Sequence, residues 1–185
     1  MHLNLRRQKI LEALAVIASL AYTLLYTYEI IWCWLFAALS AGIYLYLCFL
    51  RRIYAESLLQ IFYLYTAWYG WQNWGMRLTG EASNLNLNTH GIIVLSGLGL
   101  VIISGFLLKR LSDAATPYVD AFTTIFSIFA TILMVNFFPS NWLYWIVIDG
   151  VSVYLYYHRR LYLTAGLFFL YTLLAINGYF TWVNI

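Results

Sequence analysis

Residues 51–74 read RRIYAESLLQIFYLYTAWYGWQNW, and their pattern returns 108 positions later as RRLYLTAGLFFLYTLLAINGYFTW at residues 159–182. Both copies begin with Arg-Arg-x-Tyr, have glycine at the twentieth position and end in tryptophan. A bias toward apolar residues would give scattered matches, but not this common spacing of arginine, glycine and tryptophan. The stretch therefore indicates an internal repeat, which has to be recognised before any motif is interpreted.

The repeat extends through both halves of the chain. Residues 10–74 align with residues 118–182 without a gap, and 18 of the 65 pairs are identical. The acidic residues near the start of each copy, Glu12 and Asp120, also match in kind. Further identical pairs are Ser19 and Ser127, Trp34 and Trp142, Gly42 and Gly150, Tyr46 and Tyr154, Tyr63 and Tyr171, Gly70 and Gly178, and Trp74 and Trp182. We interpret the two halves as a duplicated scaffold.

The composition places this scaffold in a membrane. Of the 185 residues, 64% are hydrophobic and 9% are charged, whereas soluble domains contain roughly 25% charged residues. An apolar stretch of about 18 residues is long enough to cross the hydrocarbon layer. Seven stretches have about this length, near residues 10–27, 31–50, 54–74, 91–109, 118–136, 141–157 and 161–183. The sequence predicts an all-α integral membrane protein with seven transmembrane helices, and it gives no indication of nucleic-acid binding.

Three spans, one linking span and three further spans give both halves the same orientation. We expect residues 1–74 and 118–185 to form two parallel three-helix repeats, joined by an external loop and a linker helix at 75–117. In folds with parallel repeats, substrate sites lie at the repeat interface near the bilayer midplane. The N-terminal stretch also resembles a signal peptide, but it has a partner in the second repeat. We therefore expect it to be retained as the first span.

The distribution of lysine and arginine predicts the orientation. With a cytoplasmic N-terminus, nine of the ten basic residues fall on the cytoplasmic side, and only Arg77 falls outside. This asymmetry follows the positive-inside rule and requires an odd number of spans, which places the C-terminus outside. The nine residues are Arg6, Arg7, Lys9, Arg51, Arg52, Lys109, Arg110, Arg159 and Arg160.

Positions where the repeat symmetry is broken are candidates for ligand binding, because an asymmetric ligand needs different contacts from each half. Four polar residues face apolar or aromatic partners: Asp149 opposite Ala41, Gln60 opposite Phe168, Asn177 opposite Tyr69, and Gln72 opposite Phe180. A charged residue inside a span costs roughly 2.5–3.5 kcal/mol on insertion scales, so Asp149 should face a cavity or a partner. The alternative is a structural hydrogen bond to Ser152, Tyr154 or a neighbouring helix. Interhelical packing is an equal alternative for Gln60 and Asn177.

The tryptophans divide into two groups. Trp68, Trp71 and Trp145 are candidates for stacking on a ligand, whereas Trp74, Trp142 and Trp182 lie near span ends, where aromatic belts are common. Within WYGWQNW, we expect the Trp68 and Gln72 face to meet the substrate and Trp74 to lie at the outer membrane interface. Gly70 and Gly178 are expected to allow close helix approach or bending.

The candidate residues favour a particular class of ligand. Aromatic faces bind flat rings and attract cations, and Asp149 would complement a positive charge. No lysine or arginine lies inside a predicted span, which argues against a phosphorylated ligand. No cofactor or metal site is predicted, because His2, His90 and His158 are far apart in the sequence. Cys33 and Cys48 have no metal or redox spacing, so a disulfide framework is not expected.

The chain resembles the bacterial nicotinamide riboside transporters of the PnuC type. The resemblance covers nearly the whole chain and is most specific in NWLYWIVIDGVSVYLYYHRRLYLTAGLFFLYTLLAINGYFTW at 141–182, with Glu12 and the stretch 52–74 also typical. It implies the three-one-three fold shared with the SWEET sugar transporters, and uptake of nicotinamide riboside by facilitated diffusion, with trapping by a separate cytoplasmic kinase. It also implies a central pocket lined by Gln60, Trp68, Trp71, Gln72, Trp145, Asp149 and Asn177.

Several alternatives remain at this stage. Thiamine is also a cationic aromatic vitamin, and relatives with this fold carry thiamine or other vitamins and nucleosides. A membrane enzyme would need a catalytic constellation, and ATP-driven pumping would need G-x-x-x-x-G-K-[ST], which the sequence lacks. A non-transport membrane subunit and proton coupling through Asp149 or Glu12 stay open. The sequence leaves undecided the vitamin, the gates and the oligomeric state, including a homo-oligomer.

Overall fold

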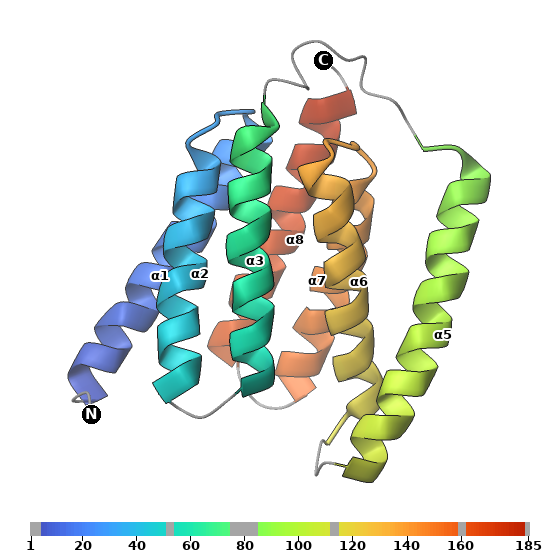
Figure 1. Cartoon of the computed structure of the whole chain (residues 1–185), viewed down its shortest axis with the longest axis horizontal. Coiled ribbons are helices and arrows are strands. Elements are labelled where there is room, and N and C mark those ends of the chain that lie inside the picture. Colours follow the sequence, from blue (N-terminus) through green and yellow to red (C-terminus); the bar gives the residue numbers. More distant parts are fainter. Residues whose placement is uncertain (1–4, 51–53, 75–84, 112–114, 159–161, 184–185) are drawn as a thin grey trace. The chain divides into compact units, whose positions relative to one another are not determined.

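The computed structural model of the chain describes residues 5–50, 54–74, 85–111, 115–158 and 162–183. Within these ranges all regular secondary structure is helical (Figure 1). The seven helices are α1 (Leu5–Thr27), α2 (Cys33–Leu50), α3 (Tyr54–Gln72), α5 (Leu87–Leu111), α6 (Pro117–Val135), α7 (Asn141–His158) and α8 (Tyr162–Val183). They coincide with the seven predicted spans to within a few residues, so the all-helical fold class is confirmed.

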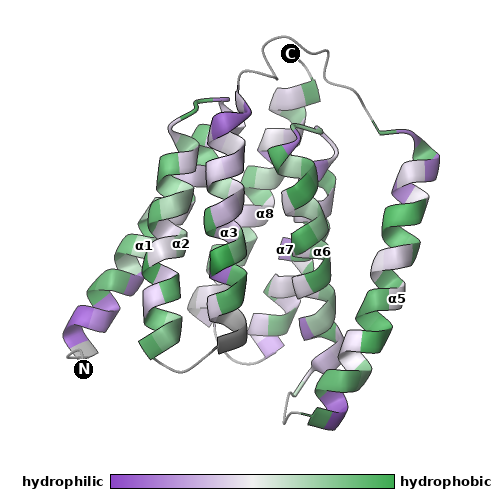
Figure 2. Ribbon diagram, viewed as in Figure 1, coloured by the Kyte–Doolittle hydropathy of each residue, from purple (hydrophilic) through white to green (hydrophobic). Residues whose placement is uncertain are grey.

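Five of the described helices are long and apolar enough to cross a membrane by length and composition alone: α1, α2, α5, α6 and α8. Figure 2 shows the hydrophobic colour along most of α5 and α6. The other two, α3 and α7, have 19 and 18 residues and are therefore also long enough. Their tyrosines, tryptophans and polar residues lower the hydropathy, and these are the helices that contain most of the candidate site residues.

The helices belong to two compact units, Met1–Gly80 and Glu81–Ile185. In the first unit α2 packs against both α1 and α3. In the second unit α7 packs against both α6 and α8, and α5 packs against α6 (Figure 1). The helix predicted at 91–109 is therefore α5, whereas its role as a linker between two repeats stays a prediction.

The turn between α1 and α2 is a left-handed helix cap. The N–H of Glu29 donates to the carbonyl of Tyr26 at 3.1 Å, and the N–H of Ile30 donates to the carbonyl of Leu25 at 2.9 Å. These two bonds form a Schellman motif, which requires a left-handed residue after the helix. Glu29 provides it with a φ of 57°, although it is not glycine.

The turn between α6 and α7 repeats this cap at an offset of 108 residues. The N–H of Phe137 donates to the carbonyl of Met134 at 3.0 Å, and the N–H of Phe138 donates to the carbonyl of Leu133 at 3.0 Å. Phe137 is left-handed, with a φ of 60°, and with Glu29 it completes the set of non-glycine residues of positive φ in the described chain. The repeat found in the sequence is therefore present in the local backbone geometry.

Each unit also contains a tryptophan that packs directly onto a glycine of the next helix. A Cβ atom at Gly70 would lie 2.3 Å from the indole of Trp34, and one at Gly178 would lie 2.6 Å from the indole of Trp142. The predicted close approach at both glycines is confirmed. The indole of Trp34 meets that of Trp74 edge-on, with ring centroids 6.3 Å apart.

The equivalent pair in the second unit, Trp142 and Trp182, meets at 5.7 Å, and both side chains are buried. The aromatic belt expected for Trp74, Trp142 and Trp182 stays a prediction, and each of these tryptophans also contacts another indole of its own unit. Trp142, like Trp34 in the first unit, packs inside its own unit, because the matched glycine leaves room for an indole between the helices.

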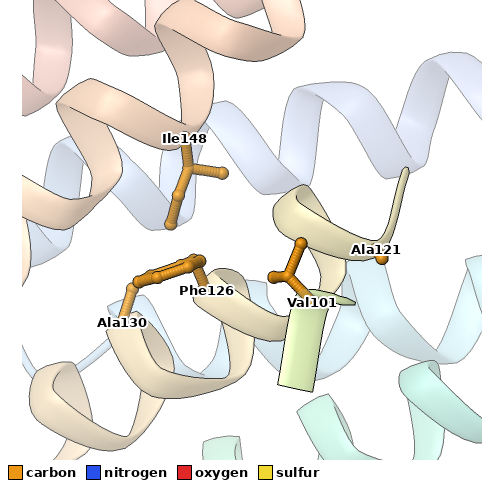
Figure 3. Close-up of a cluster of buried hydrophobic side chains, with 5 residues drawn as sticks. All are labelled: Val101, Ala121, Phe126, Ala130 and Ile148. Carbon is orange, nitrogen blue, oxygen red and sulfur yellow. The ribbon is translucent and has the colours of Figure 1, made fainter. Parts of the chain in front are cut away.

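In the second unit a hydrophobic cluster joins α5, α6 and α7. It consists of Val101, Ala121, Phe126, Ala130 and Ile148 (Figure 3). Gly97 lets α5 approach Phe126 so closely that an added Cβ would lie 2.8 Å from the ring. Tyr144 and Trp145 of α7 pack against the edge of the cluster.

Candidate functional site

The seven predicted site residues lie on three helices. Gln60, Trp68, Trp71 and Gln72 belong to α3 in the first unit, whereas Trp145 and Asp149 belong to α7 and Asn177 to α8 in the second. The structure describes each unit by itself, so the pocket expected between the repeats stays a prediction. The geometry within each unit nevertheless distinguishes the residues.

The end of α3 has two aromatic faces. Trp68 is 58% exposed and lies next to Tyr65, with ring centroids 5.9 Å apart, and Gln72 is exposed as well. Gly70 and Trp74, in contrast, face Trp34 of α2. The two faces of α3 therefore differ in exposure, whereas the predicted substrate contact of Trp68 and Gln72 and the predicted place of Trp74 at the outer membrane interface stay predictions.

Trp71 and Gln60 are less free. Trp71 is 36% exposed and meets the exposed ring of Trp32 edge-on at 5.6 Å. Gln60 is buried at 7% exposure and already interacts with its surroundings. Both residues can therefore contribute to packing of the first unit, as the structural alternative for Gln60 proposed.

Asp149 is buried, with 6% of its surface exposed. Within the described part of the chain, no hydrogen bond or ion pair reaches its carboxylate. Ser152, one expected partner, donates instead to the carbonyl of Ile148 at 2.9 Å. Tyr154, another, is exposed and stacks on His158, with ring centroids 5.9 Å apart. Ser152 and Tyr154 therefore make other contacts, and neither provides the expected structural hydrogen bond to Asp149.

Trp145 lies one helical turn before Asp149 on α7. Its indole Nε1–H is buried and donates to no acceptor in the described residues. A buried donor without an acceptor costs stability unless a ligand or water takes the hydrogen bond. An aromatic face and a buried carboxylate on adjacent turns are suited to a flat cation.

Two features of α7 were missed by the sequence reasoning. Asn141 is fully buried and its Oδ1 has no hydrogen-bond donor among the described residues. Its repeat partner is Cys33, so the broken symmetry could have identified it. In addition, the hydroxyl of Tyr144 lies 3.0 Å from Nδ1 of His90, which joins α5 to α7, and no spacing rule signals such a contact.

The remaining candidates do not form a further cluster of buried polar side chains. Asn177 is exposed on α8, and its backbone carbonyl accepts a hydrogen bond from the Thr181 hydroxyl at 2.9 Å. Cys33 and Cys48 are buried and form no disulfide within the described residues. In the described ranges no three His, Cys, Asp or Glu residues come close enough to hold a metal ion.

Comparison with known proteins places this arrangement in a family. The chain is 24% identical to the "Nicotinamide riboside transporter PnuC" of Escherichia coli (strain K12), over 94% of this chain and 85% of the relative. The protein of that name from Shigella flexneri matches with the same identity and coverage.

A solved structure, "Crystal structure of the Vitamin B3 transporter PnuC", has a similar fold, with a TM-score of 0.74 and 21% identity over 94% of this chain and 80% of that one. The pattern of the nicotinamide mononucleotide transporter family matches residues 9–184. This chain is therefore a multi-pass membrane protein, not an enzyme, and it belongs to the nicotinamide mononucleotide transporter family.

Proposed function

We propose that the protein takes up nicotinamide riboside, a small cationic aromatic vitamin, and that Gln60, Trp68, Trp71, Gln72, Trp145, Asp149 and Asn177 contact it. The names of the relatives support this substrate. The principal observation is that α7 carries the buried carboxylate Asp149 one turn after Trp145, whose buried Nε1–H has no acceptor in the described residues. A pyridinium ring provides both the flat face and the positive charge that these two side chains accept.

The distribution of basic residues favours the riboside over the mononucleotide. In the described helices, lysine and arginine occur only near the start of α1 and in the last turn of α5. A phosphate deep in the membrane would need such a cation, because arginine and lysine provide the charge-assisted hydrogen bonds that proteins use for phosphate. The described helix interiors contain no such partner.

A binding titration of the purified protein tests this substrate. We expect saturable binding of nicotinamide riboside and much weaker binding of nicotinamide mononucleotide, thiamine and riboflavin. Preferential binding of thiamine would assign the protein to the alternative vitamin, and equal binding of the mononucleotide would contradict the charge argument.

We further propose that transport is facilitated diffusion. The sequence lacks the phosphate-cradling motif of ATP-driven pumps, and Asp149 is the one acidic residue deep in a predicted span. Uptake into proteoliposomes should therefore bring substrate to equal concentrations inside and outside, without accumulation. Accumulation that a protonophore abolishes would show proton coupling instead.

The proposed location is the bacterial inner membrane, with the N-terminus in the cytoplasm and the C-terminus outside. The support is the nine-to-one distribution of basic residues in the sequence. Reporters fused after Ile185 should be active only when they are of the periplasmic type. Activity of a cytoplasmic reporter at this position would reverse the topology.

A further inference from the structure

We infer that Asn141 determines specificity for the carboxamide of the ligand, through a hydrogen bond from the carboxamide N–H to Asn141 Oδ1. This inference rests on the proposed function and adds a residue to the predicted site. It starts from the unmet hydrogen-bonding capacity of a fully buried side chain. Asn141 Nδ2 donates to the carbonyl of Phe138 at 2.7 Å, whereas Oδ1 is buried with no donor among the described residues.

Asn141 is the first member of a row on α7. Residues 141, 145 and 149 follow one another at intervals of four, so at 100° per residue they lie within an arc of about 80°. The row rises by roughly 12 Å along the helix axis, at 1.5 Å per residue. Along it the structure places an acceptor at Asn141 Oδ1, a donor at Trp145 Nε1 and the carboxylate of Asp149.

Asn141 Oδ1 and Trp145 Nε1 are buried without hydrogen-bond partners in the described chain, and no hydrogen bond or ion pair reaches the Asp149 carboxylate there. A serine on the same side of α7 has its hydrogen bond. Ser152 uses its hydroxyl for the carbonyl of Ile148. Buried side-chain atoms outside the row also lack hydrogen-bond partners in the described chain, namely Trp142 Nε1, Ser140 Oγ and, in the first unit, Trp34 Nε1. Buried polar groups in folded proteins nearly always have partners, which points to a ligand or ordered water along residues 141–149.

The neighbours of α7 place this row between two packing surfaces. Ile148 packs into the cluster with Phe126 of α6 (Figure 3). Trp142 packs on the other side, against Gly178 of α8. By helical angle the row lies between these two directions, and its middle member, Trp145, also packs against the edge of the cluster.

The chemistry of the ligand orders its groups along the row. The ring nitrogen of nicotinamide riboside is positive and bears the ribose, so Asp149 attracts that side of the ring. The carboxamide is attached to the ring two atoms away from the nitrogen and points in another direction. With the ring against Trp145, the carboxamide is directed toward Asn141, whose Oδ1 accepts its N–H.

The test is the ratio of affinities for nicotinamide riboside and nicotinic acid riboside, which share the ribose and differ only in the carboxamide. A carboxylate has no N–H and would meet an acceptor oxygen, so the wild-type protein should prefer nicotinamide riboside. Asn141→Cys introduces the residue that the first repeat buries at the equivalent position, Cys33. Asn141→Ser is a second variant, because serine is well tolerated at the beginning of a helix.

Both variants should reduce the preference roughly tenfold, which corresponds to the loss of one good hydrogen bond. Asn136→Ala is the matched control, since Asn136 Nδ2 also donates to a backbone carbonyl, that of Ile132 at 2.7 Å, but its side chain is exposed. This control should leave the preference unchanged.

The outcomes separate the inference from the proposed function. If both affinities fall together in the Asn141 variants and the ratio stays constant, Asn141 only closes the turn and the inference is wrong. The same holds if the wild-type protein binds both ribosides equally. If the wild-type protein binds neither riboside, the proposed function fails and the inference fails with it.

Discussion

The two three-helix segments, α1–α3 and α6–α8, have the same internal construction. The left-handed cap at Glu29 recurs at Phe137, and the contact of Trp34 with Gly70 recurs as the contact of Trp142 with Gly178. Such features fix how neighbouring helices enter and pack. They have been retained in both segments because either segment would lose its packing without them.

A smaller feature follows the same rule. The Thr23 hydroxyl donates to the carbonyl of Ser19 at 3.1 Å, and the Thr131 hydroxyl donates to the carbonyl of Ser127 at 2.7 Å. Both pairs are identical in the repeat alignment. Even a side-chain bond within one helical turn is thus preserved at the offset of 108.

The segments differ where α7 has a buried carboxylate and a buried amide side chain. Asp149 and Asn141 correspond to Ala41 and Cys33 of α2, which are small and buried and place no carboxylate or amide there. The comparison separates two kinds of residue. Symmetric positions build the scaffold, and the asymmetric positions on α7 introduce a buried carboxylate and a buried amide that α2 lacks.

The largest effect is expected at the most asymmetric position. Asp149→Asn should weaken binding of nicotinamide riboside by about 2–5 kcal/mol, because it removes the charge that complements the pyridinium. The uncharged dihydro form of the riboside should lose much less. Ser152→Ala is the control, and calorimetric titration is the measurement. Equal losses for the charged and uncharged ligands would show that Asp149 does not bind the cation.

The next effect concerns the symmetric glycines. Gly70→Ala and Gly178→Ala should each lower the free energy of unfolding by roughly 1–3 kcal/mol, because the new methyl group overlaps an indole. Gly42 and Gly150 are a matched pair with open space around them. Their replacement by alanine should be neutral or stabilise by up to about 1 kcal/mol. Thermal unfolding in detergent measures the stability of all four alanine variants. Unequal losses at Gly70 and Gly178 would show that the two tryptophan–glycine contacts are not equivalent.

The two faces of α3 give the third prediction. Trp68→Ala should weaken ligand binding by roughly 1–3 kcal/mol through the loss of one stacking surface. Trp74→Phe should leave affinity almost unchanged but lower the stability of the first unit by about 0.5–1.5 kcal/mol, because it alters the edge-on contact with Trp34. Affinity and melting temperature should be measured for both variants. Similar losses of affinity would show that the two faces are not distinct.

The smallest effect is expected at the helix cap. Glu29→Gly should stabilise the protein by about 0.5–1 kcal/mol. Glycine adopts the left-handed conformation without the steric cost that glutamate has, and its greater conformational freedom in the unfolded chain offsets part of this gain. Glu29→Val should destabilise it, because a β-branched residue is disfavoured at positive φ. Melting temperatures provide the comparison. A stabilising valine would contradict the cap geometry.

The sequence predicted much of this architecture because the determinants are local. The span predicted at 118–136 is α6 at Pro117–Val135, and the one predicted at 141–157 is α7 at Asn141–His158. Apolar length determines whether a segment can cross a bilayer, and it can be counted directly. The offset of 108 likewise identified Gly70 and Gly178 as positions of close approach, which the structure confirms.

The candidate site was predictable only in part. Symmetry breaking selected Asp149, but hydropathy and residue type could not tell which polar neighbours were already hydrogen-bonded. Asn141 was not selected, although its repeat partner, Cys33, also breaks the symmetry. Only the structure shows that its Nδ2 closes the turn while its Oδ1 is left buried and unmet.

By itself, the sequence determined the membrane class, the number and approximate bounds of the helices and the register of the repeat, because these depend on composition and spacing along one chain. The tertiary structure decided the roles of the aromatic and polar side chains. A tryptophan near a span end suits a membrane interface and a packed helix contact equally well by composition. The space above Gly178, available only when α7 and α8 pack, places Trp142 in the interior.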